Sequence, residues 1–454
     1  MIGKREARRL VNFVIRQSAA DQVEVAILNH KQALTRFANN YIHQNVSESN
    51  SSITVRVAFG KKLGIASTNS VETKKIKDTV EWAEKIAHLQ KENKDFVSLP
   101  KARPGNNRRH KLHVKRTEDF SARARAEAVK EIIGVARRNG LNSFGSVSNG
   151  TAEICVANSL GTFAYSVCDD LYCNIVMSAS DSTGFSQTGT RDAGAADFRG
   201  LAEKAANKAL VSAHPVDLKP GRYTTIFEPL AASEFLSFMA YYAFNGKMYQ
   251  EGRSFLTQKL GSKIIDERIT LIDDPYNRMG FAFPFDFEGV PKKRLVLIEK
   301  GTAKNVVYDS MTAHKERRKS TGHSLGAPGF FGPVPLNIVM KPGRKSVDQM
   351  IRETERGVLV TRFHYTNVID PHKLVFTGMT RDGTFLIEDG KITKGVKNLR
   401  FTENIIEVLN RLEDISAKQE LVADDPGYGA RFATGTVVPA IKVRDFHFTS
   451  ATEF

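Results

Sequence analysis

A chain of 454 residues is too long for one ordinary hydrophobic core, so two domains are the default expectation. Hydrophobic residues make up 41% and charged residues 26%, which is typical of a globular protein, and no apolar run approaches the ~18 residues of a membrane-spanning helix. The formal net charge of +16 favours an anionic partner or a solvated basic face.

The amino-terminal residues and the cysteines bear on the compartment. Residues 1–20 have helical apolar spacing but lack the apolar core and cleavage site of a signal peptide, with a basic amphipathic targeting helix as the alternative. Without a Cys-x-x-Cys pair, buried thiols are expected rather than a disulfide framework or a zinc knuckle, and the cysteines are Cys155, Cys168 and Cys173. These features predict a cytoplasmic protein.

An internal repeat organises the first half of the chain. "RFANN", which ends at Asn40, and "CVANS", which ends at Ser159, are each followed by a polar turn, a strand and a helix that carries "AEK". The offset between the copies is constant at 119 residues (157 − 38 and 202 − 83), and a helix is expected before each copy. The sequence therefore predicts a duplicated helix, hairpin, strand and helix unit, with helices covering one face of a sheet.

A basic segment, residues 101–116, lies between the two copies. Proline, a Gly-Asn-Asn turn and the lack of an apolar period predict a solvated linker, with a polyanion patch as the alternative. The segment has no aromatic residues to stack on nucleobases. His110 and His113 have no Cys, Asp or Glu beside them, so they make a poor metal pair.

Beyond residue 221, short β-rich runs are punctuated by Gly, Pro, Asn and Asp, as in antiparallel strands. Two helices interrupt them, at 346–357, where Ser346 and Gln349 form a capping-box pattern, and at 402–415. The predicted fold class is α+β. The domains are an N-terminal helix-and-sheet domain over 1–214, with units 1–98 and 120–214 and linker 99–119, and a C-terminal β-rich domain over 221–454 that is antiparallel and barrel- or sandwich-like.

Two familiar motifs are present without their structural context. "GHSLG", residues 322–326, matches a serine nucleophile elbow, but the flanking residues predict neither the strand before it nor the helix after it. "GYGARF", from Gly427, resembles a dinucleotide loop but lies outside any βαβ unit.

The segment "YTTIFEPLAASEFL", residues 223–236, joins a strand to an apolar helix. Pro229 suits the first helical position, which places Glu228 at the helix N-terminus, where the dipole favours the ionised carboxylate and weakens it as a base. The favoured interpretation is a helix-capping carboxylate. Substrate contact and metal-free catalysis are the alternatives.

The chain resembles the TldD/PmbA family, also called TldD/TldE, of two-subunit peptidases. The resemblance runs through "RFANN", "ANSLGTF", "LVSAHPVDLKPGRYTTIFEP", "STGHSLGAPGF", "VMKPGRKSVDQMI", "GVLVTRFHYTN" and "VPAIKVRDFHFTS". "DGTFLIEDGKITKGVKNLRFTEN" is the most specific part, because it is similar to the family's Leu-Ile-Glu-Asn-Gly-Lys-Ile signature.

The resemblance implies where a zinc site would lie. TldD-type subunits carry His-Glu-x-x-x-His, and here Phe227 and Ala232 replace the two zinc histidines while Glu228 retains the catalytic glutamate position. The family's ligand cysteine would fall within 423–431, where there is none. We therefore expect no metal and no other cofactor in this chain, zinc only in a TldD-type partner, and no confident catalytic residue.

This pattern resembles the TldE/PmbA-type subunit, which lacks the zinc ligands. The resemblance implies a non-catalytic subunit that pairs with a TldD-type subunit, or with itself, and shapes a chamber for extended peptides. Candidate substrate-binding residues, with a basic surface loop and an ordinary half-buried strand as the alternative, are His314, Arg317, Arg318, His323, Arg362, His364 and Tyr365. On a strand, Arg362 and His364 would share a face and Tyr365 would take the other.

Two other functions stay open at this point. One is an autonomous hydrolase that acts as a homodimer through an unrecognised site. The other is a nucleic-acid or topoisomerase-associated protein, which the charge and the family's old description as gyrase modulators suggest, and which predicts DNA affinity that falls steeply with salt. A membrane partner is not expected.

Overall fold

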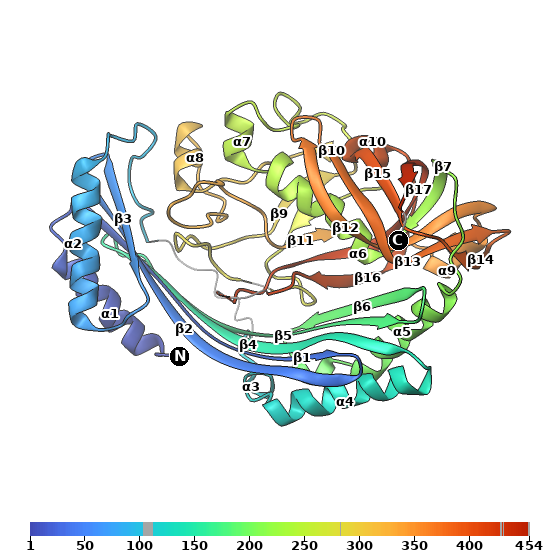
Figure 1. Ribbon diagram of the computed structural model, residues 1–454. Coiled ribbons are helices and arrows are strands. Elements are labelled where there is room, and N and C mark those ends of the chain that lie inside the picture. The colour runs from blue at the N-terminus through green and yellow to red at the C-terminus, as the bar shows by residue number, and fades with distance from the viewer. Residues whose placement is uncertain (103–111, 282, 427–428, 430, 453–454) are drawn as a thin grey trace.

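The computed structural model describes residues 1–102, 112–281, 283–426, 429 and 431–452 (Figure 1). Its first half is a six-stranded antiparallel sheet in the order β3-β2-β1-β4-β5-β6. The strands are β1 (Gln22–Ala38), β2 (Tyr41–Phe59), β3 (Lys62–Thr68), β4 (Asn142–Asn158), β5 (Phe163–Ser178) and β6 (Thr183–Thr190). The helices are α1 (Lys4–Gln17), α2 (Thr73–Leu89), α3 (Lys115–Glu118), α4 (Ala122–Arg138) and α5 (Phe198–Val211), with a 3-10 turn at Ala193–Ala195.

The predicted duplication is confirmed by this sheet. α1, β1, β2, β3 and α2 form one unit, α4, β4, β5, β6 and α5 form the other, and the long strands β1 and β4 pair at the centre. In the first unit the β1–β2 turn consists of Asn39 and Asn40, both with positive φ, which suits the two-residue hairpin turn that favours asparagine. The helices cover the outer face, whereas the C-terminal half lies against the inner face (Figure 1).

The C-terminal half is an eleven-stranded mixed sheet in which β7, β12, β13, β15 and β17 close into a ring, because β17 also pairs with β7. This β-rich half agrees with the prediction. Most pairs are antiparallel, but β7–β12 and β11–β17 are parallel, which long connections between those strands permit. The strands are β7 (Gly221–Phe227), β8 (Leu271–Asp273), β9 (Leu295–Glu299), β10 (Thr302–Ala303), β11 (Ile338–Met340), β12 (Arg356–Asp370), β13 (Val375–Glu388), β14 (Lys391–Gly395), β15 (Leu399–Asn404), β16 (Leu412–Ala423) and β17 (Gly435–Ala451).

The helices of this half are short. They are α6 (Pro229–Phe238), which continues into a π-helical turn at Met239–Ala243, α7 (Gly246–Gln250), α8 (Ser310–Lys315), α9 (Val347–Arg352) and α10 (Ile405–Asn410). The predicted capping box at Ser346 and Gln349 begins α9. The helix predicted over 402–415 is shorter than expected, because residues through Asn404 belong to β15 and residues from Leu412 belong to β16.

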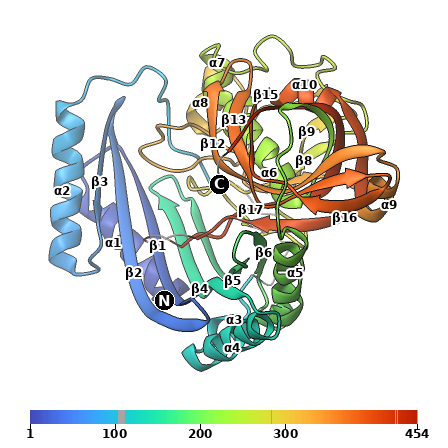
Figure 2. The same ribbon diagram turned by 45° about the vertical axis from the view of Figure 1, so that its right-hand side comes forward.

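Two of the molecule's apolar clusters build the strand ring and join the two halves. One fills the strand ring with phenylalanine rings from β7, β12, β13, β15 and β17, and α6 packs on it (Figure 2). The other joins the halves, where Ile154 and Val156 on the inner face of the N-terminal sheet contact Phe283 and Phe285. Among the described residues, no helix combines the length and the apolar character needed to cross a membrane.

The basic segment is described only in part. Residues 103–111 lie outside the described residues, and Lys115 and Arg116 begin the short helix α3 rather than continuing a loop. His113 lies 2.8 Å from Asp169, measured from Nδ1 to Oδ2. The three cysteines are free thiols, with Cys155 and Cys173 buried.

Candidate functional site

The junction at Glu228 has the local geometry that the sequence predicts. β7 ends at Phe227, Glu228 is the N-cap residue of α6, and Pro229 occupies the first turn. The Glu228 amide donates to the carbonyl of Val360 at 3.0 Å, which fixes this residue to β12. The carboxylate therefore leaves the ring at the start of a buried helix.

The expected helix cap is not what this carboxylate forms. Glu228 makes no side-chain capping hydrogen bond, and instead accepts one from the ammonium of Lys208 on α5, in the other half of the molecule. The two side chains are 15% and 9% exposed. Glu228 pairs with Lys208 rather than with the amides of α6, because an ion pair in a low-dielectric site is stronger than a hydrogen bond from a neutral donor.

This pairing sets the protonation of Glu228. Burial is the largest single influence and opposes ionisation, but the charges of Lys208 and Lys204 and the hydrogen bonds to the carboxylate together outweigh it and hold the pKa of the carboxyl below its ordinary value. Burial lowers the pKa of the Lys208 ammonium, and Glu228 opposes that shift. The carboxylate is thus a charged structural partner, and a carboxylate with a lowered pKa is a weak base.

The two positions beside Glu228 are packed with hydrocarbon. Phe227 is fully buried, with its ring centroid 4.9 Å from that of Phe446, 5.2 Å from that of Phe235 and 5.4 Å from that of Phe363. Ala232 is 2% exposed and belongs to the same cluster. Neither side chain has a lone pair to offer a metal, and a catalytic zinc needs three protein ligands.

The surrounding residues that the structure describes do not supply the missing metal ligands. Within the described ranges, no group of three or more His, Cys, Asp or Glu side chains could hold a metal ion. The residues at 227, 228 and 232 therefore do not fit zinc, and no catalytic step can be derived through a metal there.

The segment expected to hold the cysteine ligand carries a different group. Arg431 is 1% exposed and its Nε donates to Asp170 of β5 at 2.8 Å, so the guanidinium lies against the inner face of the N-terminal sheet. Gly150 makes room for it, because a Cβ there would come within 2.2 Å of the Arg431 side chain. The sequence carried no signal for this pair, whose members are 261 positions apart.

Arg362 is also an inter-layer contact. Its Nε donates to Asp382 at 2.8 Å, and its guanidinium carbon lies 4.1 Å from the centroid of the Phe185 ring on β6. Thr183 on the same strand donates to Asp382 at 2.7 Å. Arg362 thus joins the ring to the N-terminal sheet.

His364 and Tyr365 follow on β12. Burial lowers the pKa of His364, and so do the charges of Arg381 and Arg362. Tyr365 lies at a register shift with a φ of 51°, is 73% exposed, and has its ring centroid 4.5 Å from that of His364. The irregularity turns this ring outward.

The other four candidates lie near α8 and divide into two groups. His323 is fully enclosed, with Nε2 2.9 Å from Asp273 Oδ2 and Nδ1 2.9 Å from Thr321 Oγ1, so it holds its loop rather than lining a cleft. His314, Arg317 and Arg318 are exposed. His314 and Arg318 line one cavity, and Arg318 Nε lies 3.2 Å from Glu316.

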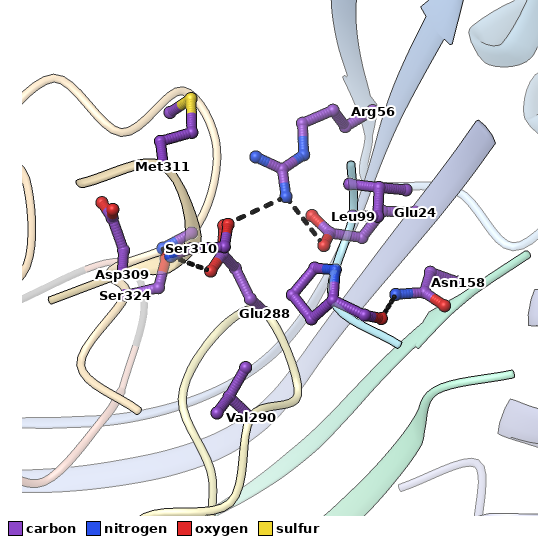
Figure 3. A network of polar contacts seen from close by, with 12 residues as sticks. Glu24, Arg56, Leu99, Asn158, Glu288, Val290, Asp309, Ser310, Met311 and Ser324 are labelled. Carbon is purple, nitrogen blue, oxygen red and sulfur yellow. Dashed lines mark hydrogen bonds and ion pairs between the residues drawn. The ribbon is translucent and has the colours of Figure 1, made fainter. Parts of the chain in front are cut away.

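A buried ionic network beneath α8 was not visible in the sequence (Figure 3). Arg56 on β2 donates to Glu24 on β1 at 2.8 Å and to Glu288 at 3.3 Å. Glu288 accepts the amide and hydroxyl hydrogens of Ser310 at 3.0 Å and 2.7 Å. The network ties the start of α8 to the N-terminal sheet.

Carboxylates outnumber the arginine in this network. Burial, followed by the charge of Glu288, raises the pKa of Asp286 to about 8 and also raises the pKa of Asp309. Burial raises the pKa of Glu24 against the opposing charge of Arg56. The network therefore retains protons that exposed carboxyls would release.

Comparisons with known proteins agree with this fold. Residues 23–87, 112–213 and 220–450 match the PmbA/TldA metallopeptidase domain 1, central domain and C-terminal domain, respectively. The structure of TldE from Thermococcus kodakarensis superimposes with a TM-score of 0.84 and 25% identity, covering 98% of this chain and 99% of that chain.

Two curated relatives add sequence support. A protein named "Metalloprotease PmbA homolog" from Haemophilus influenzae is 23% identical over 96% of this chain and 95% of the relative. A protein named "Metalloprotease" from Methanothermobacter thermautotrophicus is 28% identical over 54% of this chain, and the match spans about half, 52%, of the relative's length. With the C-terminal model alone matching 220–450, the chain belongs to the PmbA/TldD metallopeptidase family.

Proposed function

We propose that this chain is the non-catalytic, TldE/PmbA-type subunit of a metallopeptidase that degrades or processes unfolded peptides. The observation that carries the proposal is the packing of Phe227 and Ala232 into the phenylalanine core at the two positions where the family places zinc histidines. Glu228, the retained glutamate, is paired with Lys208, and Phe227 and Ala232 offer no ligand for a metal that could activate water. Cleavage then belongs to a partner subunit.

The proposed partner is a TldD-type subunit that carries His-Glu-x-x-x-His. The resemblance to TldE over nearly the whole chain supports a partnership within the family. In this role the chain supplies part of the wall around the peptide. Self-pairing would create two such walls but no zinc site.

The test is reconstitution. The chain is purified alone and together with a TldD-type subunit, and unfolded-peptide turnover and metal content are measured for each with and without a chelator. We expect turnover and bound zinc only when the TldD-type subunit is present. A stoichiometric metal bound to this chain alone and required for its own turnover would establish the autonomous hydrolase instead.

Glu228→Gln provides a matched variant for the reconstituted pair. If the carboxylate only pairs with Lys208, turnover by the pair changes by less than about twofold, whereas loss of a general base lowers turnover by about 10²–10⁴. The corresponding glutamate variant of the TldD-type subunit is the positive control. A loss of turnover in Glu228→Gln as large as in that control would assign catalysis to this chain.

A further inference from the structure

A cavity of about 450 Å³ opens between residues 97–102 and the segment from Ser310 to Ser320. Its described lining includes the cations Lys101, Arg318 and Lys319 together with His314, and no carboxylate and no Phe, Tyr or Trp ring. Leu99, Pro100, Met311 and Ala313 contribute apolar surface. We call this the α8 groove.

One wall of the α8 groove is fastened to the N-terminal sheet. The amide of Leu99 donates to the side-chain oxygen of Gln22 at 2.7 Å. The carbonyl of Pro100 accepts hydrogen bonds from Asn158 at 2.7 Å and from Thr162 at 2.8 Å. Residues 97–100 are therefore held in place without help from a ligand.

The opposite wall is fastened to the same sheet. Asp309 and Thr312 form a capping box at the start of α8, and Ser310 is bound by Glu288, which pairs in turn with Arg56. Both walls therefore keep their spacing, and a ligand that enters need not pay the entropy of ordering them.

The charge of the α8 groove is uncompensated. Arg318 pairs with Glu316, but Lys101 and Lys319 form no ion pair with any residue that the structure describes. Lysines that face a shared cavity repel one another, and an anion between them would relieve that repulsion. The apolar surface of Leu99 and Met311 adds a place for hydrocarbon beside the charges.

We propose that the α8 groove binds an acidic stretch of peptide, with side-chain carboxylates on Lys101, Arg318 and Lys319 and a neighbouring apolar side chain against Leu99 and Met311. The occupant is a peptide rather than a nucleic acid, because the described lining has no Phe, Tyr or Trp ring to stack on bases and does offer apolar surface. The inference deepens the proposed function by naming a preferred substrate class, and it rests on that function for the fate of the bound peptide.

Binding to this chain alone tests the inference. Fluorescence anisotropy measures the dissociation constant of a labelled, extended peptide in which Glu and Asp alternate with Leu, and of an analogue with Gln and Asn in their place. We expect the acidic peptide to bind at least tenfold more tightly than the amide analogue. Equal affinity for the two peptides would overturn the proposal.

Matched charge variants locate the site. K101E/R318E/K319E is compared with K74E/K77E/R123E, which makes the same charge change on the exposed faces of α2 and α4. We expect the groove variant to weaken acidic-peptide binding at least tenfold and the control variant less than threefold. Equal weakening by both would show a diffuse charge effect and overturn the site.

Two further experiments separate loss of charge from added repulsion, and a peptide site from a nucleic-acid site. K101Q/R318Q/K319Q removes the charges without introducing repulsion, and it should also weaken binding about tenfold while retaining the wild-type thermal transition. Single-stranded DNA with the same number of charges as the peptide serves as a competitor. Displacement by DNA at lower concentration than by unlabelled acidic peptide would make the α8 groove a nucleic-acid surface and overturn the assignment. Because these experiments need no partner, the groove can fail while reconstituted turnover succeeds, and the reverse also holds.

Discussion

The segment around Glu228 and the α8 groove differ in whether their charged side chains are buried and paired. At Glu228 the one carboxylate is enclosed, paired with Lys208 and flanked by the packed rings of Phe227 and its neighbours. In the α8 groove Lys101 and Lys319 are exposed and have no ion-pair partner among the described residues. The first region is part of the core, whereas the second is an exposed surface rich in cations.

The contrast bears on the proposed absence of a zinc site. Under that proposal, Phe227 and Ala232 occupy the positions of two metal ligands, which removes the need for polar partners and adds apolar contacts there. Uncompensated surface cations add little to stability. Their arrangement is therefore better explained by binding than by folding.

The largest change in the free energy of unfolding is expected in the packed region around Phe227. Phe227→Ala should lower the free energy of unfolding by about 3–5 kcal/mol, because a fully buried ring with three aromatic neighbours leaves a cavity. Phe330→Ala, at a ring that is 77% exposed, is the control and should change it by less than about 0.5 kcal/mol. Chemical denaturation checks both. A similar small effect in both variants would mean that position 227 is not packed as described.

The ion pair beside it gives the next prediction. Lys208→Met should destabilise the chain by about 3 kcal/mol, the low end for breaking a buried pair, because it leaves Glu228 enclosed without its cation. Adding Glu228→Gln should recover most of that loss. Denaturation of the two single variants and the double variant gives the coupling. If the losses simply add, the two residues do not act as a pair.

The buried network under α8 should make the free energy of unfolding depend on pH. Asp286 has a pKa of about 8 in the folded chain and an ordinary value near 3.9 when unfolded, so the folded state holds the proton more tightly. The proton held by Asp286 therefore contributes most to the free energy of unfolding at low pH. That contribution falls as the pH rises toward 8. Between pH 7 and 8 the expected loss is about 1 kcal/mol.

Glu288→Gln is the matched variant, because the Glu288 charge is a cause of the raised pKa values of Asp286 and Asp309. The free energy of unfolding, measured at pH 7, 7.5 and 8, should fall less steeply in this variant than in the parent chain. An ordinary histidine is largely neutral in this range, which limits its contribution. Equal slopes would contradict a proton held by the network.

The smallest effect is expected at the exposed ring of β12. Tyr365→Asn should change the free energy of unfolding by less than about 0.5 kcal/mol, since the ring is exposed and asparagine tolerates positive φ better than tyrosine. Thermal denaturation checks this. A loss above about 1 kcal/mol would place Tyr365 in a packed contact.

Local patterns predicted much of the fold. The repeat offset gave the two units of the N-terminal sheet, Pro229 gave the start of α6, and Ser346 with Gln349 gave the start of α9. These features depend on residues close in sequence, where propensity and capping leave a direct record. The fold class followed from them.

The side-chain contacts of the candidate site could be predicted less well from the sequence. Glu228 was expected to cap α6, but its partner Lys208 lies on α5 of the other layer, and Arg431 reaches Asp170 across most of the chain. Arg362 and His323 were predicted to contact substrate, with an ordinary half-buried strand and a basic surface loop as the alternative, yet both are held by carboxylates that the strand order brings near. Such pairs depend on tertiary placement, which periodicity does not record.

The closure of the strand ring has a consequence for how the chain folds. β7 opens the C-terminal half, but its antiparallel neighbour is β17, with Phe227 opposite Ile441, and its parallel neighbour is β12. During synthesis β7 and the apolar face of α6 must wait for nearly all of this half to emerge before the ring can close. The N-terminal units, built on hairpins between sequence neighbours, can form much earlier and offer the late half a finished surface on which to assemble.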